Sequence, residues 1–347
     1  SDNSEQLWRS WLKLQSNNLN QDQRKLLNDY STILNLITSS DETGDRIDRK
    51  IWSRYYKIFP SVANLLPCWA VTSLSAGKIP FHSNFFDILV IDEASQCDIA
   101  SALPLMYRAK NVVVIGDPKQ LRHITTLRNK QDQQLMHRYD IFEDFIQWSY
   151  SQNSFFDLPR GYCKSDDIIN LRDHHRSHSQ IISFSNKFFY QENLRIATKY
   201  ENLKIIKDDN PAVRWINCIG ETSKPTTGGA FNIKEANEVV NQLKDLIFNK
   251  NYKGSIGVVS PFRLQANKIR ELVFRDEKLL AGLNNLEFIS DTVHKFQGDE
   301  RDLMIFSPVV SKNISRGALG FLKSNGNLFN VAITRARSTL IVIGDLG

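Results

Sequence analysis

The sequence predicts an α/β protein with parallel sheets, preceded by a helical segment. Two features support this prediction. Short, almost fully apolar runs recur along the chain, as at 86–91 and 256–259, and runs without polar alternation are typical of strands buried on both faces. Segments with helical periodicity separate several of these runs, and alternating strands and helices favour a parallel sheet.

Residues 1–62 form the predicted helical segment. Apolar side chains recur there at near-helical spacing in two stretches: Leu7, Trp8, Trp11, Leu12 and Leu14, then Leu26, Leu27, Tyr30, Ile33, Leu34 and Ile37. The simplest interpretation is a helical hairpin with an apolar seam. The segment contains no recognisable catalytic or binding motif, and we expect it to pack against a larger part of the protein.

The apolar runs that predict strands begin after about residue 67. They lie at 86–91, 112–115, 256–259, 303–306 and 340–343. Helices are predicted at 234–249 and 263–281. Pro225, Gly228 and Gly229 indicate a surface loop at 220–230.

A polar, irregular segment at 125–168 separates the first two predicted strands from the other three. We therefore expect a first lobe at 63–150 and a second lobe at 151–347. Two strands are too few for a complete sheet, so the first lobe is expected to be incomplete. The chain begins with Ser1 rather than Met, which favours a fragment or a trimmed protein.

Composition narrows the class of protein. The net charge of +6 and the pI of about 9.0 permit a polyanionic partner, although solvated basic faces explain such charge equally well. The four cysteines form no CxxC pair, which argues against a zinc site or a disulfide framework. With no signal peptide and no apolar stretch near ~20 residues, we expect a cytoplasmic protein that does not span a membrane.

Acidic residues follow the first two predicted strands directly. DEASQ stands at 92–96 and GDPKQL at 116–121. Ligands of open α/β sheets bind beyond the carboxyl ends of the strands. One function for such carboxylates is a magnesium site, in which Asp92 holds the ion and Glu93 orients a water. The alternative is a pair of solvated carboxylates at a loop start.

These segments resemble motifs II and III of the superfamily 1 helicases, and further motifs of that family follow in order. They are LRDHHRSH at 171–178, SPFRLQ at 260–265, DTVHKFQGDE at 291–300 and NVAITRAR at 330–337. The resemblance covers about residues 67–346 and points to the subgroup of the nonsense-mediated-decay helicase. It implies two RecA-like lobes and an ATP-dependent helicase that moves on single-stranded DNA or RNA, with ATP and Mg²⁺ as cofactors.

The resemblance also implies roles at the nucleotide. Asp92 would bind Mg²⁺ through its waters, and Glu93 would be the base that orients the attacking water. Gln120 would sense the γ-phosphate and couple the lobes, with Asp117 of the same loop assigned to the nucleotide site.

The second lobe would complete this site. Arg176 and Arg335 would close on the γ-phosphate, and an arginine finger alone contributes ~10³–10⁵ in rate. Gly298 would offer a backbone N–H near the phosphates, and Glu300 would accept from the ribose hydroxyls.

Four residues are expected to face nucleic acid. Thr72 and Ser73, in VTSLSAG at 71–77, resemble a backbone-gripping motif of the first lobe, and Thr292 and His294 would act similarly in the second. Hydroxyls and amides hold phosphates without reading sequence. An ordinary threonine at a strand end remains the alternative for Thr72.

Three positions depart from the family pattern: His175 replaces the usual tyrosine, Lys295 a glycine, and Asp299 a polar residue. These departures leave the arginines and Glu300 in place. They affect the expected contacts with nucleic acid and the choice of strand.

The phosphate-binding loop Gly-x-x-x-x-Gly-Lys-Ser/Thr does not occur in the chain. Gly77-Lys78 is followed by Ile79, so it is not such a loop. We expect an upstream part of the same polypeptide to carry it, which makes this chain inactive alone. The alternatives are a degenerate NTPase that serves as a nucleic-acid-binding scaffold, and a magnesium-dependent nuclease using Asp92, Glu93 and Asp117.

Overall fold

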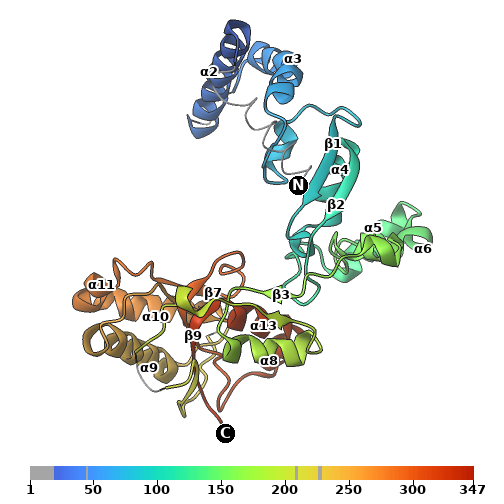
Figure 1. Ribbon diagram of the computed structural model, residues 1–347. Coiled ribbons are helices and arrows are strands. Elements are labelled where there is room, and N and C mark those ends of the chain that lie inside the picture. The colour runs from blue at the N-terminus through green and yellow to red at the C-terminus, as the bar shows by residue number, and fades with distance from the viewer. Residues whose placement is uncertain (1–18, 44–45, 208–209, 226–228) are drawn as a thin grey trace. The chain divides into compact units, whose positions relative to one another are not determined.

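The computed structural model describes residues 19–43, 46–207, 210–225 and 229–347 (Figure 1). The predicted helical stretch at 7–14, and Gly228 of the predicted loop, therefore lie outside the described residues. The chain divides into two compact units. The first is Ser1–Asp92 with Asp98–Ile115, and the second is Glu93–Cys97 with Gly116–Gly347.

A helical hairpin opens the described part of the first unit. It consists of α2 (Gln21–Thr43) and α3 (Arg49–Leu65), and the carboxylate of Asp48 caps α3 by accepting from the backbone N–H of Lys50 at 2.8 Å. The two helices share an apolar core that contains Tyr30, Ile33, Ile37, Tyr55, Phe59 and Val62. The hairpin confirms the predicted helical segment within the described residues.

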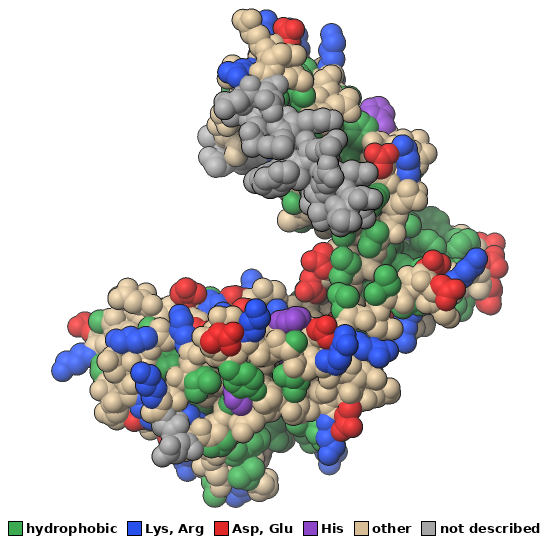
Figure 2. All heavy atoms as spheres, in the orientation of Figure 1, with side chains coloured by type: hydrophobic (Ala, Val, Ile, Leu, Met, Phe, Trp, Pro, Cys, Tyr) green, Lys and Arg blue, Asp and Glu red, His purple; other side chains and the backbone are tan. Residues whose placement is uncertain are grey.

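The first unit also contains a two-stranded parallel sheet. Strands β1 (Phe86–Ile91) and β2 (Ala109–Val114) pair in register, and α4 (Ile99–Tyr107) connects them. The expectation that both faces are buried is wrong here, because the side chains of Ile88 and Val90 are 61% and 55% exposed. The described residues provide no other strand beside this pair. Hydrophobic side chains accordingly lie at the surface (Figure 2).

The segment 125–168 is helical in part, which corrects the expectation that it is irregular. Its α-helices are α5 (Asn129–Arg138), α6 (Phe142–Phe145) and α7 (Asp157–Tyr162). Asp132 in α5 accepts hydrogen bonds from Ser149 and Ser151 at 2.7–2.9 Å. Burial would raise the pKa of Asp132, but these bonds outweigh it and lower the pKa. Polar contacts of this kind produce no apolar periodicity in the sequence, so the helices of this segment could not be predicted from it.

A five-stranded parallel sheet forms the centre of the second unit. Its order is β5-β9-β8-β6-β7. The strands are β5 (Val213–Asn217), β6 (Ile256–Ser260), β7 (Ile289–Thr292), β8 (Arg301–Phe306) and β9 (Ala336–Gly344). The three inner strands are the predicted ones, and every residue of β6 and β8 is buried. The α/β class with parallel sheets is thus confirmed.

Helices cover both faces of this sheet (Figure 1). Because successive side chains of a strand point to opposite faces, Leu303 and Ile305 pack into one core and Met304 and Phe306 into the other. The first core contains side chains of α9 (Ile233–Lys244), α10 (Arg263–Arg275) and α11 (Glu277–Leu283). The second contains side chains of α8 (Ser179–Phe189) and α13 (Asn327–Thr334).

Smaller elements complete the second unit. They are the paired strands β3 (Asp173–His174) and β4 (Arg195–Ile196), the helix α12 (Arg316–Ser324), and a π-helical turn at Asp245–Asn249 that continues α9. No helix in the described residues is long and apolar enough to cross a lipid bilayer.

Candidate functional site

The loop at 116–121 is fastened to the segment that follows β1. The Ser95 hydroxyl accepts from the backbone N–H of Asp117 and donates to its carbonyl, both at 2.9 Å. A Cβ on Gly116 would lie 2.6 Å from the ring of Phe156 and 2.9 Å from Ser95 Oγ. Glycine therefore allows the close approach, and the Ser95 side chain joins the two predicted acidic loops by bonding to the backbone of Asp117.

Glu93 adopts a strained backbone conformation directly after the first unit's sheet. Its φ of 51° and ψ of 37° lie in the left-handed region, which costs on the order of 1–3 kcal/mol and occurs often at functional sites. The side chain of Gln96 donates to its carboxylate at 3.2 Å. Asp92, the preceding residue, is exposed and belongs to the first unit.

Asp117 lies at the centre of a hydrogen-bond cluster. One carboxylate oxygen accepts from the backbone N–H of Lys119 at 2.8 Å. The other accepts from Gln120 Nε2 at 3.2 Å and from the Tyr190 hydroxyl at 2.6 Å. Gln120 Oε1 is buried and has no hydrogen-bond partner among the described residues. Because buried polar atoms are almost always paired, this oxygen is available to a ligand or a water.

Arg335 is a buried cation, 3% exposed, at the end of α13. Its guanidinium donates to the carbonyl of Val331 at 3.2 Å and to the carbonyl of Asp299 at 3.3 Å. Burial lowers its pKa most, and the positive charge of Arg176 lowers it further. Arginine nevertheless remains protonated in proteins.

Two carboxylates of the same unit oppose the lowering of the pKa of Arg335. The charges of Glu93 and Glu300 raise the pKa of Arg335. The structure therefore brings the predicted base, Glu93, into the electrostatic environment of the predicted finger.

Arg176 extends from a turn that several contacts fix. The backbone N–H of Ser177 donates to the ring of His174 at 2.9 Å, and that of His178 donates to the carbonyl of Arg337 at 2.7 Å. Burial, followed by the charges of Arg176 and His175, lowers the pKa of His174 to about 4. A neutral His174 ring can therefore accept this bond at neutral pH.

Glu300 pairs with two arginines. Its carboxylate lies 2.5 Å from Arg176 Nε and 3.6 Å from Arg337 Nε. Gly298, two residues earlier, has a φ of +84°. Residues with a side chain rarely adopt this backbone conformation, whereas glycine adopts it readily. The structure brings Arg176 and Glu300 together, and the ribose contact of Glu300 stays a prediction.

The residues expected at nucleic acid belong to different units. Thr72 and Ser73 are exposed in the first, where the Thr72 hydroxyl accepts from the backbone N–H of Ser75 at 3.1 Å. They lie just before the 3-10 helix at Ser75–Lys78 and do not end a strand. In the second unit Thr292 is 8% exposed at the end of β7, and burial lowers the pKa of His294.

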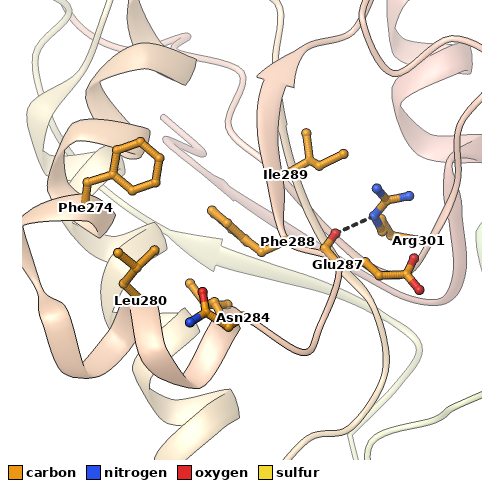
Figure 3. Close-up of a pocket in the computed structure, with 8 residues that line it drawn as sticks. Phe274, Leu280, Asn284, Glu287, Phe288, Ile289 and Arg301 are labelled. Carbon is orange, nitrogen blue, oxygen red and sulfur yellow. Dashed lines mark hydrogen bonds between the residues drawn. The ribbon is translucent and has the colours of Figure 1, made fainter.

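One pocket of about 450 Å³ contains none of the predicted site residues (Figure 3). Phe274, Leu280 and Phe288 give it an apolar lining, and Arg301 Nε at its edge donates to the carbonyl of Glu287 at 2.8 Å. The described residues also contain no cluster of three or more His, Cys, Asp or Glu that could hold a metal. Magnesium sites, however, commonly use one or two carboxylates together with substrate phosphates.

No role was predicted from the sequence for three residues of this site, although one of them, Asn330, begins the motif at 330–337. Tyr190 donates to Asp117, and Asn330 Nδ2 donates to the Tyr190 hydroxyl at 3.0 Å and to the Lys119 carbonyl at 2.9 Å. Asn327 Nδ2 donates to the Gln120 carbonyl at 2.9 Å. Two asparagines three residues apart share a helix face, which was the available signal. Tyr190 carried none.

Comparison with known proteins identifies the family. Two family models, each described as an AAA domain, match residues 12–126 and 151–347. Helicase sen1 of Schizosaccharomyces pombe is 31% identical over 288 residues, which are 80% of this chain and 16% of that protein. The uncharacterized ATP-dependent helicase MG140 of Mycoplasma genitalium is 28% identical over 82% of this chain and 25% of its own length.

A human relative gives the same picture. The probable helicase senataxin is 28% identical over 75% of this chain and 9% of its own length. The chain thus spans between 9% and 25% of these three relatives. With one AAA domain match covering more than half of its residues, and with helicases as its relatives, the chain belongs to the superfamily 1 helicases.

Proposed function

We propose that this chain is the C-terminal portion of an ATP-dependent helicase or translocase that moves on single-stranded DNA or RNA. The observation that carries the proposal is Arg335, a guanidinium only 3% exposed that donates to the backbone carbonyls of Val331 and Asp299. Burying a charge is costly unless it has a partner or a task. Stabilising the charge of a transferring phosphoryl group is such a task.

The residues of the second unit fit an anionic nucleotide. Arg335 and Arg176 would neutralise the γ-phosphate charge. Gln120, whose Oε1 has no partner among the described residues, would sense the γ-phosphate and couple the lobes. Glu93 would orient the attacking water and accept its proton. Bound ATP with Mg²⁺ would supply the phosphoanhydride whose cleavage drives movement.

The remaining assignments follow from the motifs. Asp92 would supply a carboxylate to Mg²⁺, with Asp117 organising the adjacent loop through its three donors. Gly298 and Glu300 would contact the nucleotide from the second lobe. If Glu300 left Arg176 and bound the ribose hydroxyls instead, Arg176 would be available to the γ-phosphate.

The first unit supports an upstream partner segment. The 347 residues contain no phosphate-binding loop, and the side chains of Ile88, Val90 and Val113 are about half exposed or more. Parallel sheets are almost always covered on both faces. We propose that an upstream part of the same polypeptide covers this sheet and carries the loop.

Two lobes and a nucleic-acid track complete the proposal. The family matches leave a gap between residues 126 and 151, which supports a lobe boundary near 150. Thr72 and Ser73 in one lobe, and Thr292 and His294 in the other, would hold the phosphate backbone, and the net charge of +6 favours such a partner.

ATP hydrolysis by the full-length protein tests this proposal. We expect turnover that single-stranded RNA or DNA stimulates, whereas the 347-residue chain alone binds ATP weakly and hydrolyses almost none. Robust turnover by the chain alone would overturn the missing-loop proposal. A full-length protein that binds nucleic acid without hydrolysing ATP would instead be the scaffold.

A further inference from the structure

We propose that Tyr190 is a positioning residue that holds the loop at 116–121 against helix α13. It would thereby fix the position of Gln120 relative to Arg335. The role rests on the proposed function, because it concerns the same nucleotide site. Neither the motifs nor the family resemblance assigns Tyr190.

The Tyr190 hydroxyl connects two elements by hydrogen bonds. It donates to Asp117 Oδ2 at 2.6 Å and accepts from Asn330 Nδ2 at 3.0 Å. We call this pair of bonds the Tyr190 bridge. A phenol has one donor and can accept as well, so one oxygen links the loop after β2 to the helix that ends at Arg335.

Further bonds reinforce the same contact. Asn330 Nδ2 also donates to the Lys119 carbonyl at 2.9 Å, and Asn327 Nδ2 donates to the Gln120 carbonyl at 2.9 Å. Asn330 is fully buried. The loop that carries Gln120 is therefore held on the face of α13 by side chains, and its position depends on how firmly they are held.

Tyr190 itself follows directly on α8, where several hydrogen bonds hold the chain. The backbone N–H groups of Tyr190 and Glu192 both donate to the Asn186 carbonyl, at 3.2 and 2.9 Å. Gln191 and Glu192 take left-handed φ values of 53° and 60°. The side chain of Asn186 closes the turn through two bonds to the backbone of Leu194.

The electrostatics keep this phenol a donor. Burial, followed by the nearby charge of Asp117, raises the pKa of the Tyr190 hydroxyl. The phenol is therefore protonated at neutral pH and can donate to Asp117. Phenylalanine would keep the ring in place and remove both bonds, which isolates the hydroxyl's contribution.

Tyr190→Phe in the full-length protein tests the proposal, with Tyr252→Phe as the matched control. Tyr252 is buried, Tyr190 is partly buried, and the Tyr252 hydroxyl donates to the Lys204 carbonyl at 2.9 Å rather than to the loop at 116–121. We expect Tyr190→Phe to lower kcat by about ten-fold to a hundred-fold, as misplacement of a catalytic group does. The dissociation constant for ATP should stay within about two-fold of the wild-type value.

Hydrogen exchange gives a readout that does not depend on activity. Amides of residues 116–121 should exchange at least about ten-fold faster in Tyr190→Phe than in Tyr252→Phe, with α8 unchanged, because the loop loses its anchor. Unchanged loop exchange together with unchanged kcat would refute the bridge. Inactive wild-type protein with loop exchange that responds to Tyr190→Phe would refute the proposed function and retain the bridge.

Asn330→Ala keeps the proposal testable if Tyr190→Phe misfolds. It removes the other side of the bridge, so by itself it should also accelerate exchange at residues 116–121, and unchanged loop exchange would contradict the bridge. Where both variants fold, the two substitutions together should accelerate loop exchange less than their separate effects combined, because both break the bond between Tyr190 and Asn330. Fully independent effects of the two substitutions would show that no shared bridge exists.

Discussion

Glu235→Gln should remove a pH dependence from the stability of the second unit. Glu235 is fully buried on α9, where one carboxylate oxygen accepts from the Ser307 hydroxyl at 2.6 Å and from the backbone N–H of Val309 at 3.1 Å. Burial raises its pKa to about 7, although hydrogen bonds from Ser307, Val309 and Asn232 oppose the shift. The folded protein therefore favours the protonated form.

The sign and size of the effect follow from linkage. A raised folded-state pKa contributes stability that is complete below the ordinary pKa of 4.5 and is lost as pH rises through about 7. At 1.36 kcal/mol for each pKa unit, this corresponds to about 3 kcal/mol, lost mostly between pH 5 and 7. A glutamine has the same shape and no charge, so its contribution should not change over this window.

Hydrogen exchange of the β8 amides between pH 5 and 8 measures this contribution, after correction for the intrinsic pH dependence of exchange. The wild-type opening free energy should fall by about 3 kcal/mol relative to that of Glu235→Gln. Glu238→Gln, on the same helix and less buried, is the control and should behave as wild type. Parallel curves for wild type and Glu235→Gln would refute the reasoning.

Two further substitutions test the site and the hairpin. Arg335→Ala should lower ATP turnover of the full-length protein by about 10³-fold or more with a smaller effect on ATP binding, because the lost cation acts mainly on the transition state; equal losses in both would assign it to binding. Phe59→Ala should destabilise the α2–α3 hairpin by about 3–5 kcal/mol, since Phe59 is fully buried in its core. Faster exchange in α2 with unchanged exchange in β8 would confirm it, and Lys57→Ala, an exposed change on the same helix, is the control.

The inner strands of the second sheet could be predicted because their environment leaves a simple signature. Strands β6 and β8 are buried throughout and carry long apolar runs. The edge strand β5 could not, because Val213–Asn217 contains arginine, asparagine and a half-exposed tryptophan. The apolar runs of β1 and β2 predicted strands correctly, but their burial depends on cover that the described residues do not supply.

The residues of the candidate site likewise fall into some that the sequence indicates and some that it does not. The apolar runs made Asp92, Glu93 and Asp117 candidate site residues, because carboxylates near the end of a predicted strand are visible in the sequence. Their roles stay predictions. The contact between Tyr190 and Asp117 joins residues 73 positions apart, and that between Tyr190 and Asn330 joins residues 140 apart. Nothing local marks such a pair, since it exists only after α8 and α13 have packed together.

The substitution Glu93→Gln in the full-length protein tests the central claim most directly. Glutamine keeps the size of the side chain but cannot take a proton from the attacking water. Loss of a general base commonly costs about 10²–10⁴ in rate, so ATP binding should survive while hydrolysis falls below about one hundredth of the wild-type rate. Turnover near the wild-type rate would show that Glu93 does not orient the water, and it would contradict the nucleotide site described above.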